Sequence, residues 1–231
     1  MPFYVGGAEA NVATALALWN IPSAYLTALP QNFVAEQLVG YLNSRQVHTD
    51  HIVYQGDRVG LYYLPKGKDL KNTGVIYDRA GSAYADLKPG TIDWEKVFED
   101  VSWFHFSAIC PAISQSVADV CEEALKVAVQ KNITISLDLN YRAKLWQYGK
   151  DPVEVMPALA QYCDLIMGNI WAANKMLGIP LDEGLIKTLD KESLQHHATL
   201  TSRAILEKFP KCRTVANTFR FDYQQGIRYF T

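Results

Sequence analysis

Polar side chains that could bind a ligand stand at the ends of three successive predicted strands. Ser107 follows WFHF, Asp138 and Asn140 follow ITISL, and Asn169 ends DLIMGN. In open α/β sheets, ligands bind beyond the carboxyl ends of the strands, where loops and helix N-termini meet. We therefore expect these residues to line a site at one edge of a sheet.

Arg142 stands four residues after Asp138 at one of these strand ends. A carboxylate and a guanidinium at this spacing could hold a polyhydroxylated or anionic ligand between them. Alternatively, Asp138 caps the turn and Arg142 forms a surface ion pair, since strand ends need caps in any protein. From residue type alone the two interpretations have equal weight.

Two glycines, Gly6 and Gly7, stand directly before the alanine-rich stretch AEANVATALALWN. Val12, Ala13, Leu16 and Ala17 recur in it at helical spacing. Glycine lets backbone N–H groups approach a ligand closely, and a helix N-terminus favours oxygen-rich or negative groups. A double glycine is equally typical of a tight turn that leads into a helix and binds no ligand.

A segment rich in tyrosine, residues 56–82, interrupts the alternation of helices and strands. RVGLYYLPKG and NTGVIYDRAGSA, joined by the polar turn KGKDLKN, predict a hairpin-like pair of strands. Tyr77 and Arg79 share one face because side chains two apart do so, and Tyr62 lies on the other strand. Rings with one arginine suit a sugar acid, and they equally suit a dimer interface.

The remaining pattern predicts an α/β fold with a doubly wound, mostly parallel sheet and helices on both faces. Helices are expected at 33–45, 93–100, 114–131, 152–162 and 170–177, and mostly over 182–209. Strands are expected in SAYLTAL, HTDHIVY, VSWFHFSA, ITISLDLN, DLIMGN, RTVANTF and GIRYF. The expected organisation is a core of residues 1–55 and 82–231 with a small β lid at 56–81.

Composition narrows the partners of this 231-residue chain. A formal charge of −2 without a basic run argues against nucleic acid, and no apolar run approaches a membrane span, so we expect a cytoplasmic protein with a small-molecule or protein partner. Four scattered cysteines, Cys110, Cys121, Cys163 and Cys212, are expected to be buried thiols in a reducing compartment. The pair His196-His197 is not expected to hold a metal, because adjacent histidines on a helix point about 100° apart.

Three motifs in this order, GGAEANVA, YDRAGSA and DLNYR, resemble the ribokinase-like (PfkB) family of carbohydrate kinases, most of all its 2-keto-3-deoxygluconate kinase branch. The likeness runs over nearly the whole chain. It implies transfer of the ATP γ-phosphoryl group to a hydroxyl of a sugar or sugar acid, with ATP and Mg²⁺ as cofactors. It also implies a homodimer formed through the lids.

The resemblance assigns roles to residues of this chain. Gly6, Gly7 and Asn11 would bind substrate hydroxyls, and Tyr62, Tyr77 and Arg79 would contact the substrate from the lid. Arg142 would bind the substrate carboxylate or the transferring phosphate, and it is the catalytic residue that the resemblance assigns within this sequence. Asp138 and Asn140 would order its loop, and Asn169 would lie near the phosphates.

The chain also departs from the family pattern. The strand that precedes GG is reduced to MPFYV, the glutamate of an NxxE motif is Ala172, and no GxGD sequence occurs. The family's GxGD aspartate is the general base. We therefore expect residues 1–231 alone to be inactive and to represent a truncated kinase. The alternatives are a fructokinase-type enzyme or a sugar-binding relative that has lost catalysis.

Overall fold

The computed structural model describes residues 3–64, 74–182, 184, 190–223 and 226–230. The chain divides into two compact units: residues 1–93 with 113–120, and residues 94–112 with 121–231. The expected turn at 66–72 and part of the segment 182–209 lie outside the described residues. Among the helices in the described ranges, none is both long and apolar enough to cross a lipid bilayer.

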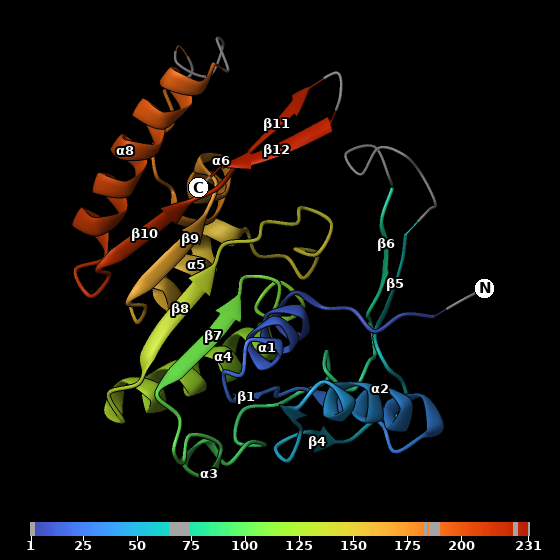
Figure 1. Ribbon diagram of the computed structural model, residues 1–231. Coiled ribbons are helices and arrows are strands. Elements are labelled where there is room, and N and C mark those ends of the chain that lie inside the picture. The colour runs from blue at the N-terminus through green and yellow to red at the C-terminus, as the bar shows by residue number, and fades with distance from the viewer. Residues whose placement is uncertain (1–2, 65–73, 183, 185–189, 224–225, 231) are drawn as a thin grey trace. The chain divides into compact units, whose positions relative to one another are not determined.

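Among its described residues, the first unit has two helices that lie wholly within it and three pairs of short strands (Figure 1). Its elements are α1 (Ala8–Leu18), β1 (Ser23–Ala24), β2 (Ala28–Leu29), α2 (Phe33–Ser44), β3 (Val47–His48), β4 (Val53–Tyr54), β5 (Leu61–Tyr63) and β6 (Ile76–Asp78). β1 pairs with β3 and β2 with β4, both in parallel, and β5 and β6 form an antiparallel hairpin. The helix and the hairpin predicted here are therefore confirmed.

The helix α1 packs through its alanines. Ala10, Ala13 and Ala17 are buried in one cluster with Leu42 and Val47. Val12, expected on the same face, is exposed instead. Small side chains let the helix backbone approach β1 and β3 closely, so the buried stripe follows alanine and not the larger residue.

The stretch SAYLTAL forms two short strands where one was expected. The backbone N–H of Tyr25 donates to the His48 carbonyl, and that of Val53 donates to the Thr27 carbonyl. Between these two bonds the partner chain turns, so the ladder is interrupted. The cause lies in the partner strand and has no trace in SAYLTAL itself.

The second unit is built on a four-stranded parallel sheet with the order β10-β9-β8-β7 (Figure 1). Its elements are α3 (Trp94–Val97), β7 (Trp103–Ser107), β8 (Thr134–Asp138), α5 (Pro152–Ala160), β9 (Leu165–Gly168), α6 (Ile170–Leu177), α8 (Lys191–Lys208), β10 (Thr214–Asn217), β11 (Phe219–Tyr223) and β12 (Gly226–Phe230), and α4 (Gln115–Gln130) runs through both units. β11 and β12 pair antiparallel. The strands and helices predicted from residue 93 onward are present among the described residues, with two differences. The helical segment expected over 182–209 is described as α8 from Lys191 onward, and the stretch RTVANTF covers β10 and the first residue of β11, where one strand was expected.

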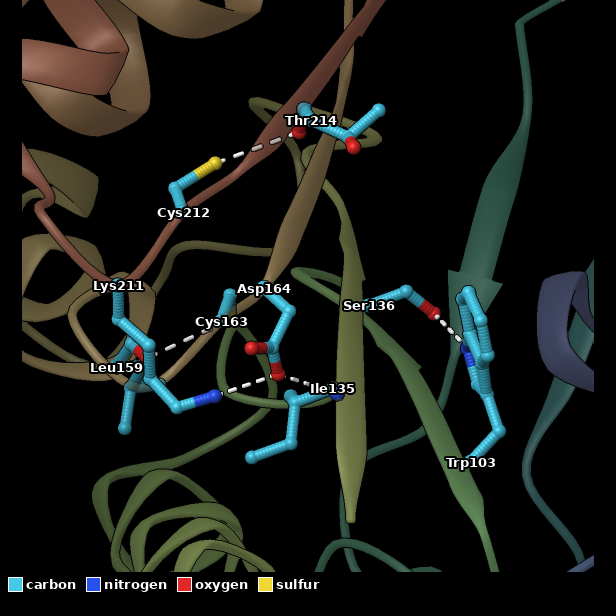
Figure 2. A network of polar contacts seen from close by, with 9 residues as sticks. All are labelled: Trp103, Ile135, Ser136, Leu159, Cys163, Asp164, Lys211, Cys212 and Thr214. Atoms are coloured by element: carbon cyan, nitrogen blue, oxygen red, sulfur yellow. Dashed lines mark hydrogen bonds and ion pairs between the residues drawn. The ribbon is translucent and has the colours of Figure 1, made fainter. Parts of the chain in front are cut away.

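Both faces of the strand β8 are covered. Ile135, Ser136 and Leu137 are consecutive and all buried, although successive side chains point to opposite faces. The one polar member, Ser136, accepts a hydrogen bond from Trp103 Nε1 (2.8 Å) (Figure 2). Its Oγ also lies 2.8 Å from His105 Nδ1. A buried hydroxyl with partners on the neighbouring strand is compatible with a fully covered sheet.

Asp164 joins three strands at their amino ends. Its Oδ2 accepts a hydrogen bond from the backbone N–H of Ile135 (2.9 Å) and forms an ion pair with Lys211 Nζ (2.5 Å) (Figure 2). Its carbonyl accepts the backbone N–H of Arg213 (2.8 Å). One residue thus fixes β9 between β8 and β10.

The four cysteines are all unpaired thiols. Cys163 and Cys212 are buried as expected, whereas Cys110 and Cys121 are only partly buried. Burial raises the pKa of the Cys163 thiol far above its ordinary value. The pKa of Cys212 is also raised, mainly by burial, and its Sγ donates to the Thr214 carbonyl (3.3 Å). Both thiols stay protonated in the folded protein near neutral pH.

Candidate functional site

The predicted site residues fall into two sets, one in each compact unit. Gly6, Gly7, Asn11, Tyr62, Tyr77 and Arg79 belong to the first unit, and Asp138, Asn140, Arg142 and Asn169 to the second. Their common role in one site stays a prediction.

The two glycines meet different requirements. Gly7 is the N-cap of α1 with φ +135°, a conformation that L side chains rarely adopt, and its carbonyl accepts the backbone N–H of Asn11 (3.0 Å). Gly6 is needed for close approach, because a Cβ there would collide with the hydroxyl of Tyr62 and lie 3.0 Å from its Cζ. The start of α1 is therefore in contact with the hairpin.

The hairpin carries three of the predicted residues on one face. Tyr62 and Tyr77 are direct cross-strand partners, so their side chains project to the same side. The guanidinium of Arg79 lies over the Tyr77 ring, with 5.0 Å between Cζ and the ring centroid. Stacking on a ring uses the flat face of a guanidinium, so its N–H groups still point outward in the plane and can bind a carboxylate through two parallel hydrogen bonds.

The loop after β8 begins with a turn closed by its own carboxylate. Asp138 Oδ1 accepts the backbone N–H of Asn140 (3.0 Å), as in an Asx turn. The Arg142 guanidinium donates to the Tyr141 carbonyl (2.9 Å), and its side chain is exposed. Asp138 thus caps the turn, as one of the two interpretations of the sequence expected. Arg142 projects from the loop that follows.

Asn169 begins a helix. It is the N-cap of α6, and its side-chain oxygen accepts the backbone N–H of Ala172 (2.8 Å). Ala172, at the position where the resemblance would place a glutamate, is buried. The helix N-terminus supplies N–H groups suited to an anion, but this position supplies no carboxylate.

A small depression without room for a water molecule lies at the carboxyl ends of β9 and β10. Leu139, Gly168, Asn169, Ala216 and Asn217 are among the residues that line it. Sequence reasoning missed Asn217, although it ends RTVAN in the way that Asn169 ends DLIMGN. Its Nδ2 donates to Ser202 Oγ (2.8 Å) and thereby connects the strand end to α8.

His197 has a structural position. It is buried, its Nε2 accepts the backbone N–H of Asp182 (2.9 Å), and its Nδ1 lies 3.3 Å from Thr201 Oγ1. Within the described ranges, no three His, Cys, Asp or Glu residues come together in a way that could hold a metal ion.

The sequence matches the pfkB family carbohydrate kinases over residues 1–202. The chain belongs to this family. A relative from Haloferax volcanii, 2-dehydro-3-deoxygalactonokinase, is 33% identical over 147 residues, which are 63% of this chain and 46% of the relative. A 5-dehydro-2-deoxygluconokinase from Clostridium beijerinckii is 26% identical over 72% of this chain and 49% of the relative.

Solved structures of pfkB proteins share the fold. The 2-dehydro-3-deoxygluconokinase of Thermotoga maritima is 38% identical with a TM-score of 0.81, over 93% of this chain and 63% of that one. A pfkB family carbohydrate kinase from Listeria grayi is 30% identical with a TM-score of 0.76, over 94% and 63%. The expected ribokinase-like α/β fold is confirmed, and the chain spans about half the length of the curated relatives it matches.

Proposed function

We propose that the protein is an ATP-dependent kinase of a 2-keto-3-deoxy sugar acid, with 2-keto-3-deoxygluconate as substrate and its 6-phosphate as product. The observation that carries the proposal is the guanidinium of Arg79 stacked on Tyr77, on a hairpin face shared with Tyr62. Family membership supports a sugar kinase, and relatives named for 2-dehydro-3-deoxy sugar acids support the substrate class.

In the proposed reaction the C6 hydroxyl oxygen attacks the γ-phosphorus of ATP. The new bond is O–P, the bond to the β–γ bridging oxygen breaks, ADP leaves with that electron pair, and the hydroxyl proton passes to water. Phosphoryl transfer depends on positioning and on stabilising charge around the transferring group. Arg79 is proposed to grip the sugar-acid carboxylate, and Arg142 the carboxylate or the transferring phosphate.

The other residues have supporting roles in this proposal. Gly6, Gly7 and Asn11 bind sugar hydroxyls, the Asp138–Asn140 turn orders the loop before Arg142, and the N-terminus of α6 at Asn169 faces phosphate. Mg²⁺ typically binds through phosphate oxygens, water and one or two carboxylates. We therefore propose that it enters as the complex with ATP, and we assign it no ligand among these residues.

A panel of acceptors tests the substrate. ADP release by the full-length protein is measured with 2-keto-3-deoxygluconate, its galacto epimer, fructose and ribose. We expect the highest kcat/KM for 2-keto-3-deoxygluconate. A preference for fructose or ribose would contradict the assignment and favour a fructokinase-type enzyme. A preference for the galacto epimer would keep the sugar-acid class but change the proposed substrate to that epimer.

The role of Arg79 is tested in the same assay. Arg79→Met should lower kcat/KM for the sugar acid by at least about tenfold, because a charged hydrogen bond contributes about 1.5 to 3 kcal/mol. The control is Arg45→Met, since Arg45 also stacks on a tyrosine, Tyr41, but at the end of α2. Equal losses in both variants would contradict the assignment.

Ala172 favours a second function, sugar binding without phosphoryl transfer. It stands where the family resemblance places a glutamate near the metal and phosphates. Binding of the sugar acid measured by calorimetry, together with no sugar-dependent ADP release from the full-length protein, would support this alternative. Turnover above roughly 1 s⁻¹, the low end of ordinary kinase rates, would exclude it.

A further inference from the structure

Arg79 follows directly after the last paired residue of the hairpin. The β5–β6 ladder joins three residue pairs, and β6 ends at Asp78. A short two-stranded hairpin is marginally stable by itself. The position of the Arg79 backbone therefore depends on contacts outside the ladder.

Those contacts come from Arg58. Its Nη1 donates to the Ala80 carbonyl (2.9 Å), and its Nη2 donates to the Asp78 carbonyl (3.2 Å) and to Asp78 Oδ1 (2.6 Å). One planar guanidinium thus holds the carbonyl groups on both sides of Arg79. It also reaches the Asp78 side chain, which points away from the face that carries Tyr77.

Arg58 is itself anchored to the chain beyond Arg79. Its carbonyl accepts the backbone N–H of Ala83 (3.0 Å), and the Arg79 carbonyl accepts the N–H of Ser82 (3.1 Å). Gln55 Nε2 adds a bond to the Ala83 carbonyl (2.7 Å). The brace therefore acts between two segments that are already tied together.

We propose that Arg58 is a positioning residue of the sugar-acid site, which fixes the backbone around Arg79 so that the Arg79 guanidinium stays over the Tyr77 ring. This inference rests on the proposed function, in which Arg79 grips the substrate carboxylate. Only a guanidinium offers donors at the spacing needed for two carbonyls and a carboxylate at once. A lysine keeps the charge but not this fork.

The first test needs no substrate. Hydrogen exchange of peptides covering residues 79–84 is compared between wild type and Arg58→Lys. The amides of Ser82 and Ala83 should exchange at least about tenfold faster in the variant, because the guanidinium fork that braces this segment is lost and short hairpins open locally. Arg45→Lys is the matched control, and Asp78→Asn, which keeps both carbonyl bonds, should change exchange much less.

The second test is a double-mutant cycle in the full-length protein, with ADP release as the readout. Arg58→Lys alone should raise KM for 2-keto-3-deoxygluconate and lower kcat/KM about ten- to hundredfold, because small misplacements of binding groups are costly. In an Arg79→Met background it should cause almost no further loss, since it acts through Arg79.

The outcomes separate the two proposals. With an active wild type, losses that multiply in the double variant, or unchanged exchange in Arg58→Lys, overturn the positioning role and leave the kinase assignment intact. A wild type without sugar-acid turnover fails the proposed function, and the role of Arg58 toward a substrate falls with it. If Arg58→Lys does not fold, Arg58→Gln is taken through the same cycle, with Asp78→Asn again as the control that keeps both carbonyl bonds.

Discussion

At the scale of single residues, the contact between Gly6 and Tyr62 makes a small change informative. Gly6→Ala should move the Tyr62 ring, because the new Cβ would occupy the space of its hydroxyl. The atoms that the new Cβ would meet are at the free end of the Tyr62 side chain, which can move, so the free energy of unfolding should change little. In contrast, kcat/KM for the sugar acid should fall about tenfold. Calorimetry and steady-state kinetics measure the two quantities. A large loss of stability with normal kinetics would contradict the proposed role of this contact.

A second residue-scale prediction concerns Arg142, which projects from the loop ordered by Asp138. Arg142→Lys removes the paired donors that grip a carboxylate or phosphate in parallel. Transition-state stabilisation should fall by about 1.5 to 3 kcal/mol, the range for a charged hydrogen bond. Steady-state kinetics of the full-length variant, with Arg45→Lys as control, measure it. An unchanged kcat/KM would leave Arg142 as a surface residue.

At the scale of elements, two glycines give opposite predictions for the same substitution. Gly40 lies inside α2, and a Cβ there would meet no atom within 4 Å. Gly40→Ala should therefore stabilise the protein by about 0.5 to 1 kcal/mol. Gly178 caps α6 with φ +67°, and a Cβ there would lie 3.2 Å from Val153, so Gly178→Ala should destabilise it. Urea unfolding measures both, and two shifts of one sign would contradict the argument.

Elements were also the scale at which sequence reasoning worked best. The helix α2 and the parallel strands from β7 to β10 follow from local periodicity, and the strand-end rule found Asp138 and Asn169. The division of SAYLTAL depends on where a distant partner turns, and the brace by Arg58 joins residues 20 and 22 positions apart. Neither leaves a local pattern. Asn217 could have been found, because it obeys the same strand-end rule.

At the scale of the whole molecule, the buried thiols predict how stability depends on pH. The raised pKa of Cys163 means that the folded state keeps a proton which the unfolded chain loses above pH ~8.5. The stabilising effect is complete below that pH and is lost as pH rises, by about 1.4 kcal/mol per pH unit. Urea unfolding between pH 8 and 10 should show a shallower decline in Cys163→Ala than in wild type. Parallel curves would contradict this assignment.

The ties made by Asp164 have a consequence at the opposite end of β9. Asn169 stands five residues further along the chain, about 16 Å away in an extended strand. A slip of β9 by one position would turn every alternate side chain to the wrong face and carry Asn169 out of line with Asp138. A random screen for lost kinase activity should therefore recover substitutions at Asp164 that resemble damage to a phosphate contact. Their signature would be recovery at low temperature or with added glycerol, which a missing catalytic group would not show.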